Sequence, residues 1–408
     1  MVIGAPFVWP HGTFVVLAMT VLYASAALIA IAWTQRRSHR SKLSLDRSMP
    51  MVTVLKPLRG FDDALEDNLE SFAHLRYPNY EIIFATRSAD DPALEVARLI
   101  AARNRHCRIR ILAGVDGDAA NPKVLLLEAM LQHARGQLLL ISDSNVRIER
   151  DDLTDLVQPM SDDTVGMVYQ PVVGVGERTA AAAMENSRFT EQGSMGMIFA
   201  KRLAGVDAAV GKGILLRREA LGSIDDFRRL RDVLAEDYLL GVEMRRAGWR
   251  CVLSHTPVQA VHVDWSLRAL LSRHLRHSSM RFRLSPWTYP IEAVTNLTLI
   301  GTLPVFLSGW TGLVVFAAAA GIKTLLDAVV LYSARGSWPK ARYLLLLPIK
   351  DLLMAGVWLA GIFNSQVHWR GVSYRIGMGT RLVPLGMPGD DEPAILRMPQ
   401  PAQRRRAA

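Results

Sequence analysis

Residues 137–145 read QLLLISDSN, an apolar run that leads directly into an acidic residue, and this stretch decides the fold. Residues 138–141 contain nothing polar to place on a solvent face, so we expect a strand that is buried on both faces, as in parallel sheets. Three more strands are predicted upstream, with helical patterns between them: strands 51–56, 81–86 and 108–113, and helices 62–75, 91–103 and 122–134. This alternation predicts an α/β fold with a doubly wound, mostly parallel sheet.

Three acidic residues lie at the ends of these elements, where α/β sheets bind their ligands. Asp91 follows the second strand, Asp143 follows the fourth, and Asp237 opens a helical run at 236–248. Each also has a simpler interpretation: a helix cap for Asp91, a turn for Asp143 and a favourable helix dipole for Asp237. Their common position at element ends favours a shared functional site. The phosphate-binding loop and the G-x-G-x-x-G fingerprint are both absent, which argues against those nucleotide sites.

The composition is too apolar for an ordinary soluble enzyme. Of 408 residues, 50% are hydrophobic and 21% are charged. Residues 1–33 contain no charged residue, and basic residues follow from Arg36 onward. Such a run can cross ~30 Å of hydrocarbon, and the positive charges after it put the next domain in the cytosol. A cleaved signal peptide is the alternative, but no basic residue precedes the run, which also continues past the Ala24-Ser25-Ala26 sequence.

A second apolar region begins near Ile291. Residues 293–322 carry no charge and would form a helix about 45 Å long, more than one crossing needs. Its Gly and Pro residues therefore predict a break, at Gly301, Pro304 or Gly309. A third apolar run, 343–363, carries adjacent charges and is either a crossing or an interfacial or re-entrant segment.

The number of predicted membrane crossings conflicts with the charge of the C-terminus. Three crossings after a cytosolic domain would leave the C-terminus outside, yet the last residues are rich in arginine. We expect a cytosolic tail. The pattern predicts five parts: an N-terminal transmembrane anchor with a basic flank (1–42), a cytosolic catalytic domain (43–265), an interfacial amphipathic helix (266–290), C-terminal membrane segments (291–365) and a basic, partly disordered tail (366–408).

Several short motifs, in order along the chain, resemble those of membrane-bound glycosyltransferases of families 2 and 21. They are KPLRG (56–60), DDPA (90–93), NPK (121–123), DSN (143–145), GKGILLRRE (211–219), EDY (236–238) and RHLR (273–276). The closest resemblance is to ceramide glucosyltransferases and bacterial hopanoid-type glycosyltransferases. It covers about residues 50–290 and implies a GT-A fold between membrane segments, with three spaced aspartates and a (Q/R)-x-x-R-W motif. His277 stands where the family has tryptophan.

The resemblance implies a role for each aspartate. Asp91 would help bind the uridine of the donor. Asp143 would hold Mg²⁺ or Mn²⁺ against the sugar diphosphate, with Asn145 in place of a second carboxylate. Asp237 would be the general base that takes the proton from the acceptor hydroxyl.

The remaining candidates divide between donor and acceptor. Arg273 and Arg276 would stabilise the departing diphosphate, because arginine makes multiple hydrogen bonds to phosphate. Three polar residues would line the donor pocket, although the last is as readily a surface lysine: Lys56, Asn121 and Lys123. Three residues of the amphipathic stretch would face a lipid acceptor: His277, Leu267 and Leu271.

The resemblance therefore implies an inverting transfer of a hexose from a UDP-sugar to a membrane lipid, with UDP-glucose and ceramide favoured. A lipid N-acetylglucosaminyltransferase acting on a hopanoid, or a processive polysaccharide synthase, is the alternative. The net charge of +10 is concentrated beside membrane segments, which indicates anionic lipid rather than nucleic acid as its partner. We expect an integral protein of a bacterial inner membrane. Two cysteines exclude a disulfide scaffold.

Overall fold

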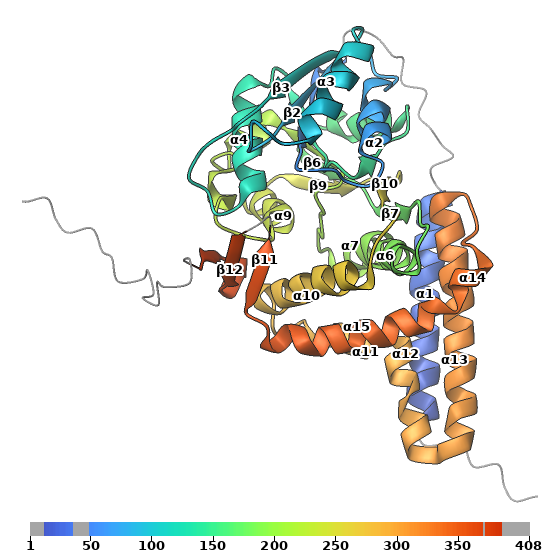
Figure 1. Ribbon diagram of the computed structural model, residues 1–408. Helices are drawn as coiled ribbons and strands as arrows, with labels where there is room; N and C mark the ends of the chain where they lie inside the picture. Colours follow the sequence, from blue (N-terminus) through green and yellow to red (C-terminus); the bar gives the residue numbers. More distant parts are fainter. Residues whose placement is uncertain (1–11, 36–48, 370–371, 386–408) are drawn as a thin grey trace, which may run out of the picture.

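The computed structural model describes residues 12–35, 49–369 and 372–385 (Figure 1). The basic flank predicted after the first apolar run, and most of the predicted C-terminal tail, lie outside the described residues.

A seven-stranded sheet forms the centre of the predicted catalytic domain, in the order β3-β2-β1-β4-β8-β6-β9. Strands β1 to β4 are parallel, β8 is antiparallel to both of its neighbours, and β6 and β9 are parallel. The bounds are β1 (Val52–Pro57), β2 (Tyr80–Ala85), β3 (Arg108–Leu112), β4 (Leu138–Ile141), β6 (Val165–Tyr169), β8 (Ile214–Arg217) and β9 (Arg250–Leu253). The predicted mostly parallel α/β sheet is confirmed.

Helices cover both faces of this sheet. Leu139 and Ile141 of β4 pack into the hydrophobic core under α4, whereas Leu138 and Leu140 pack into the core under α2 and α3. All four residues of β4 are buried, as its apolar sequence predicts. The helices of this domain are α2 (Leu65–Ala73), α3 (Ala93–Arg103), α4 (Pro122–His133), α5 (Asp152–Val157), α6 (Ala180–Thr190), α7 (Met197–Ala204), α8 (Arg218–Gly222) and α9 (Glu236–Arg246).

A smaller sheet and a π-helix complete the domain. The sheet has the order β5-β10-β7, with β5 (Val146–Arg147), β7 (Val172–Val175) and β10 (Val258–Val261). The π-helical turn Glu191–Gly196 connects α6 to α7. This turn faces the apolar helices and contacts both α1 and α13.

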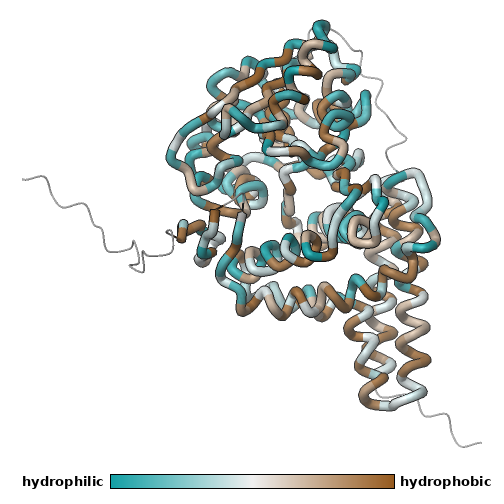
Figure 2. The backbone as a smooth tube through the Cα atoms, viewed as in Figure 1, coloured by the Kyte–Doolittle hydropathy of each residue, from teal (hydrophilic) through white to brown (hydrophobic). Residues whose placement is uncertain are grey.

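The helix α1 (Thr13–Gln35) and the long helix α13 (Leu303–Arg335) lie side by side (Figure 1). Figure 2 shows that both helices consist largely of hydrophobic residues. Helix α13 is broken at Gly309, whose φ of 56° and ψ of −125° are not helical, so the predicted break is confirmed. The chain runs away from the catalytic domain through α11 (Pro290–Val294), α12 (Leu297–Gly301) and the first turns of α13, and it returns through the rest of α13.

The last apolar helix has a different direction. Three helices are long and apolar enough to cross a membrane by length and composition, namely Thr13–Gln35, Leu303–Arg335 and Ala341–Phe363. Within the third, α15 (Leu346–Phe363) follows α14 (Ala341–Leu344) and lies across α1 and α13, packed along α10 (Leu267–Leu284) (Figure 1). This orientation brings the end of the chain back to the catalytic domain.

Buried charges join these helices to the π-helical turn. The Lys323 ammonium lies 2.6 Å from an Asp327 oxygen and 2.9 Å from an Asp351 oxygen. Lys350 pairs with Asp351 at 3.1 Å and with Glu191 of the turn. Each positive charge therefore has carboxylate partners, and these partners come from three different segments.

A three-stranded antiparallel sheet follows α15, within the range predicted as a tail. It consists of β11 (Gln366–Trp369), β12 (Val372–Ile376) and β13 (Leu382–Pro384). Its turn contacts the loop before α9: the Leu234 N–H donates to the Thr380 carbonyl (2.9 Å) and the Leu382 N–H to the Asp232 carbonyl (2.7 Å). The C-terminal sheet is therefore attached to the segment that leads into Asp237.

Candidate active site

Asp143 lies at the carboxyl edge of the parallel strands, directly after β4. Lys56 of β1 is fully buried under this loop, where its ammonium donates to the Asp143 carbonyl (2.7 Å). Burial lowers the pKa of Lys56 well below its usual value. Lys56 therefore holds the backbone of the loop rather than facing an open pocket.

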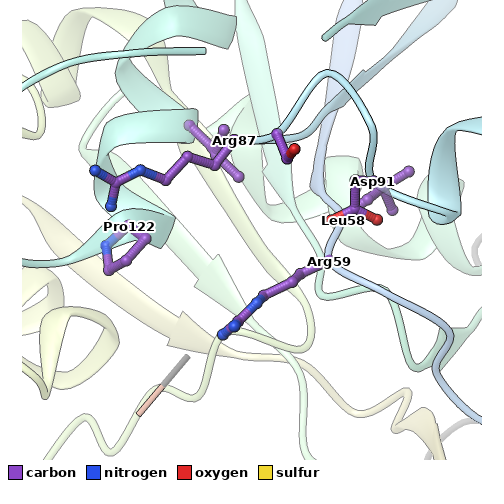
Figure 3. Close-up of a pocket in the computed structure, with 7 residues that line it drawn as sticks. Leu58, Arg59, Arg87, Asp91 and Pro122 are labelled. Carbon is purple, nitrogen blue, oxygen red and sulfur yellow. The ribbon is translucent and has the colours of Figure 1, made fainter. Parts of the chain in front are cut away.

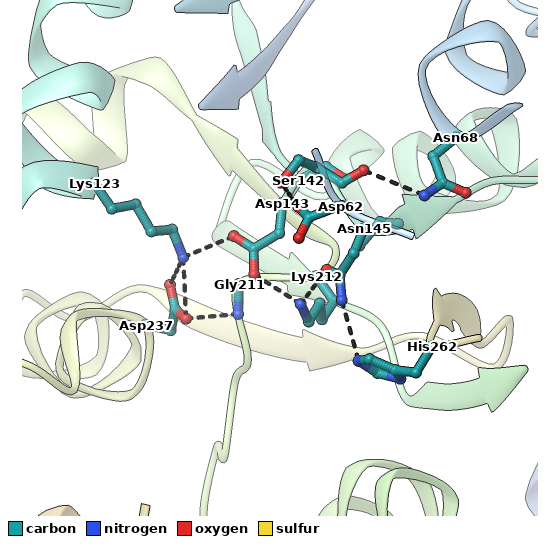
Figure 4. A network of polar contacts seen from close by, with 12 residues as sticks. Asp62, Asn68, Lys123, Ser142, Asp143, Asn145, Gly211, Lys212, Asp237 and His262 are labelled. Carbon is teal, nitrogen blue, oxygen red and sulfur yellow. Dashed lines mark hydrogen bonds and ion pairs between the residues drawn. The ribbon is translucent and has the colours of Figure 1, made fainter. Parts of the chain in front are cut away.

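Lys123 joins the predicted aspartates (Figure 4). Its Nζ lies 3.2 Å from Asp143 Oδ1, 3.0 Å from Asp237 Oδ1 and 3.0 Å from Glu236 Oε1. The side chain is only 4% exposed, so the alternative of a surface lysine is wrong. The Asp143 and Asp237 carboxylates, 94 positions apart in the chain, are thus held on one ammonium group.

Asn121 explains how Lys123 is positioned. Its side-chain oxygen accepts from the Lys123 N–H (2.9 Å) and caps α4, with Pro122 at the first helical position. Its amide nitrogen donates to Glu236 (3.1 Å) and to the Val233 carbonyl (2.8 Å). Asn121 therefore ties the start of α4 to the start of α9, and it acts on the site through its neighbours.

The charged groups in this cluster shift one another's pKa values. Burial alone would lower the pKa of Lys123, but its three carboxylate partners raise it well above the usual value. Burial and the neighbouring Asp237 raise the pKa of Glu236 to about 7. Burial opposes ionisation of Asp143 too, yet Lys123 and Lys212 hold its pKa below the usual range. Asp143 is therefore ionised at neutral pH, whereas Glu236 is close to its midpoint.

Lys212 and His262 belong to the same network, and the sequence did not single them out. Lys212 Nζ lies 3.0 Å from Asp143 Oδ2 and donates to Asn145 Oδ1 (2.5 Å). Asn145 also contacts His262 Nε2 (3.1 Å), and burial lowers the pKa of His262 to about 3, so its ring is neutral. Lys212 could have been noticed in the GKG part of a quoted motif, but His262 had no such signal.

A divalent cation does not fit the donor set as these side chains stand. Both Asp143 carboxylate oxygens are paired with ammonium groups, and the Asn145 oxygen accepts from Lys212. Among residues 12–35, 49–369 and 372–385, no group of three or more His, Cys, Asp or Glu side chains could hold a metal ion.

Asp91 lines a separate pocket of about 420 Å³ (Figure 3). Its carboxylate accepts from the Gly60 N–H (2.8 Å) and the Ala93 N–H (2.9 Å), so it also has the predicted capping role. Arg59 and Arg87, which the sequence did not single out, line the same pocket. Pro122, beside Lys123, is a further lining residue, so this pocket lies next to the Lys123 cluster.

Arg273 lies on α10 and is held by a buried carboxylate. Its Nε is 3.0 Å from Glu185 Oε1, and its guanidinium lies over the rings of Phe189 and Trp265. Lys212 Nζ lies 5.9 Å from the centre of the same Phe189 ring, so Arg273 lies on the Lys212 side of the network.

The other predicted residues of α10 are Arg276, His277, Leu267 and Leu271. Arg276 and His277 are half-buried, and burial and neighbouring arginines lower the pKa of His277. Leu267 and Leu271 line an open apolar groove of about 630 Å³ between α10 and α15.

Comparisons with known proteins agree on one family. The model of the family described as Glycosyl transferase family 21 matches residues 13–382. Ceramide glucosyltransferase 3 of Caenorhabditis elegans is 24% identical over 367 residues, which are 88% of this chain and 79% of that protein. The ceramide glucosyltransferase of Komagataella phaffii is 30% identical over 147 residues, 34% of this chain and 29% of that protein.

Solved structures give weaker likenesses. A mannosyltransferase from Pyrobaculum calidifontis in complex with GDP-Man and Mn²⁺ has a TM-score of 0.44 and 19% identity, covering 85% of this chain and 99% of that one. Residues 1–349 of S. aureus TarS in complex with UDP have a TM-score of 0.40 and 14% identity. The match covers 80% of this chain and 96% of that one.

Proposed function

Since the chain belongs to glycosyl transferase family 21, we propose that it is an inverting enzyme that moves a hexose from a UDP-sugar to a hydroxyl group of a membrane lipid. UDP-glucose is the proposed donor and ceramide the proposed acceptor. The relatives described as ceramide glucosyltransferases, at 24% identity over most of the chain, support this choice.

One observation carries the proposal: Lys123 brings Asp143 and Asp237 together at the carboxyl edge of the parallel strands. Sugar transfer needs a base near the acceptor and positive charge near the leaving diphosphate. Asp237 supplies the first, and Lys123 and Lys212 supply the second. The pocket of Asp91, Arg59 and Arg87 offers a neighbouring place for the uridine of the donor.

The reaction then follows from these positions. The acceptor oxygen attacks the anomeric carbon while Asp237 takes the hydroxyl proton, and the bond from that carbon to the diphosphate oxygen breaks. UDP leaves with the electron pair of that bond, and the configuration at the anomeric carbon inverts. The cationic side chains stabilise the charge that develops on the diphosphate, with Arg273 proposed to join them from α10.

The apolar helices support a membrane location. Phe306 and Trp310, on either side of the break in α13, are 84% and 76% exposed, as side chains in contact with lipid would be. In this arrangement α1 crosses the membrane, and the chain enters it again through α12 and the first turns of α13 and returns through the rest of α13, while α15 lies in the membrane plane. That arrangement puts the catalytic domain and the C-terminal sheet on the same side, which we propose to be the cytosol.

Labelled donor and defined acceptors test the proposal directly. The full chain, purified in lipid nanodiscs, is incubated with labelled UDP-glucose and ceramide, and the products are separated into lipid, polymer and free sugar. We expect the label in the lipid fraction. Parallel reactions use UDP-N-acetylglucosamine and a hopanoid alcohol. Label that accumulates only in a soluble polymer would make the chain a polysaccharide synthase, and label in no product would contradict the proposal.

The groove between α10 and α15 is the proposed entry for the lipid. Replacing Leu271 by Asp places a charge in this apolar groove, where it would disfavour contact with the hydrocarbon chain of a lipid. We expect transfer to a long-chain acceptor to fall at least about tenfold, with a smaller effect on hydrolysis of the UDP-sugar by water. Both rates are measured on the same preparation.

Two variants serve as controls. Leu203 is 64% exposed on α7, outside the groove, so Leu203→Asp should leave both rates unchanged. Arg276→Ala should lower transfer and hydrolysis together, because both reactions need a stabilised leaving group. Equal losses of transfer and hydrolysis in Leu271→Asp would reject the groove as the lipid entry.

The Mg²⁺ or Mn²⁺ implied by the resemblance stays a prediction. A cation bound at Asp143 would have to displace the ammonium groups of Lys123 and Lys212, so no step above depends on one. Measuring UDP binding in EDTA and in Mn²⁺ tests it.

A further inference from the structure

Lys212 occupies the position that the sequence assigned to a divalent cation. Its ammonium lies between the Asp143 carboxylate (3.0 Å) and the Asn145 amide oxygen (2.5 Å), the two groups predicted as metal ligands. The residue is only 5% exposed. A positive charge of the protein itself is therefore held by the atoms expected to bind a metal.

The backbone around Lys212 is built to hold it there. A Cβ at Gly211 would lie 2.1 Å from Lys123 Nζ and 2.6 Å from an Asp237 oxygen. A Cβ at Gly213 would lie 2.3 Å from the Gln170 side-chain oxygen. A side chain at either position would displace one of these polar groups, so glycine lets the backbone pass close to the charged groups that surround Lys212.

Hydrogen bonds fix the same tripeptide to both aspartates. The Gly211 N–H donates to Asp237 Oδ2 (2.7 Å), and the Gly211 carbonyl accepts from the Asp143 N–H (3.1 Å). The Lys212 ammonium thus extends from a backbone segment anchored to the predicted base and to the loop after β4.

The contacts of Lys212 favour an anion over a divalent cation on this side of Asp143. Both oxygens of Asp143 are paired with ammonium groups, and the Lys123 charge is shared with Asp237 and Glu236, whereas Lys212 pairs with Asp143 and with the Asn145 amide. The Asn145 amide carries no charge. A divalent cation added here would be repelled by two buried ammonium groups, whereas a diphosphate would be attracted to them.

We propose that Lys212, together with Lys123, supplies the positive charge that neutralises the donor diphosphate, so that the chain binds UDP without a divalent metal ion. This inference rests on the proposed function, since it takes a UDP-sugar as the donor. It assigns to two lysines the task that the resemblance assigns to Mg²⁺ or Mn²⁺.

Calorimetry of UDP binding tests the inference on the full chain in nanodiscs. For the wild type, we expect Kd values in EDTA and in excess Mn²⁺ that differ by less than about threefold. Lys212→Met removes a charged hydrogen-bond donor while keeping most of the length of the side chain, so Kd in EDTA should rise about tenfold or more. Lys212→Arg keeps the charge and should preserve binding in EDTA, which guards against a variant that merely folds poorly.

A matched control comes from another buried lysine–aspartate pair. Lys201 donates to Asp207 (2.7 Å) away from the Asp143 network, so Lys201→Met should leave both Kd values unchanged. If wild-type binding of UDP disappears in EDTA and returns with Mn²⁺, Lys212 only fills the place of a metal and the inference is wrong. If UDP binds in neither condition, the donor assignment itself fails, and the proposed function fails with it.

Discussion

Replacing Asp237 by Asn is expected to lower the rate of sugar transfer by ~10²–10⁴-fold, the usual effect of losing a general base. The Asn side chain has the same shape and can still accept the hydrogen bond that the Gly211 N–H donates (2.7 Å), so the loop keeps its position. It cannot take a proton from the acceptor hydroxyl. The kcat for lipid glycosylation should therefore fall while the Kd for UDP stays near the wild-type value.

The neighbouring carboxylate is the control for this assignment. Glu236→Gln keeps an oxygen that can accept from the Asn121 amide, and it should retain more activity than Asp237→Asn. The opposite order of activities would make Glu236 the base.

The pH dependence of the stability of the protein tests the raised pKa of Glu236. Burial and Asp237 raise its pKa from 4.5 to about 7, so the folded state binds an extra proton between these values. Stability should therefore fall as pH rises through this window, and Glu236→Gln should lose that slope. Thermal unfolding between pH 4.5 and 8 measures both, and an unchanged slope in the variant would contradict the shift.

Removal of the C-terminal sheet is expected to abolish transfer, although the catalytic domain and all the apolar helices would remain. A chain ending at residue 364 loses the contacts that fix residues 232–235, directly before Glu236 and Asp237. The start of α9 has no side-chain cap of its own, so the sheet holds this loop together with Asn121. A misplacement of ~1 Å at a catalytic group can cost ~10²-fold in rate. A chain ending at residue 385 should remain active.

A single residue gives a finer version of this test. Thr380 is fully buried with φ of 65°, and its hydroxyl accepts from the Ala235 N–H (3.2 Å). Thr380→Ser keeps the hydroxyl, whereas Thr380→Val leaves the Ala235 N–H without it. We expect Thr380→Val to lower kcat with little change in the Kd for UDP, and Thr380→Ser to remain near wild type. Equal activities in the two variants would show that this hydrogen bond does not position Asp237.

The central sheet was predictable because its signal is local. Four consecutive apolar residues in β4 require burial on both faces, and the strand–helix alternation then sets the parallel arrangement. The sequence also predicted that Asp143 and Asp237 share a site, since each lies at the end of a strand or helix. Lys123 remained ambiguous because a lysine at the start of a helix is usually exposed.

Long-range partners account for what the sequence did not predict. The hydrogen bond from Ala235 to Thr380 joins residues 145 positions apart, and nothing near Thr380 indicates that partner. His262 is a single histidine after a short strand, and its position beside Asn145, 117 residues away, comes only from the fold. Helix α15 has the composition of a crossing helix, but its packing against α10 gives it another direction.

The ion pairs around Glu191 have a consequence for biogenesis. Each lysine has one carboxylate partner on its own helix, Asp327 for Lys323 and Asp351 for Lys350. Each also has a partner on another segment: Asp351 of α15 for Lys323, and Glu191 of the π-helical turn for Lys350. A helix that inserts before its neighbours are in place therefore keeps only half of these ion pairs, so α13 and α15 gain further stability when the domain that carries Glu191 has folded. We expect the last-synthesised helices to reach their final packing together with that domain.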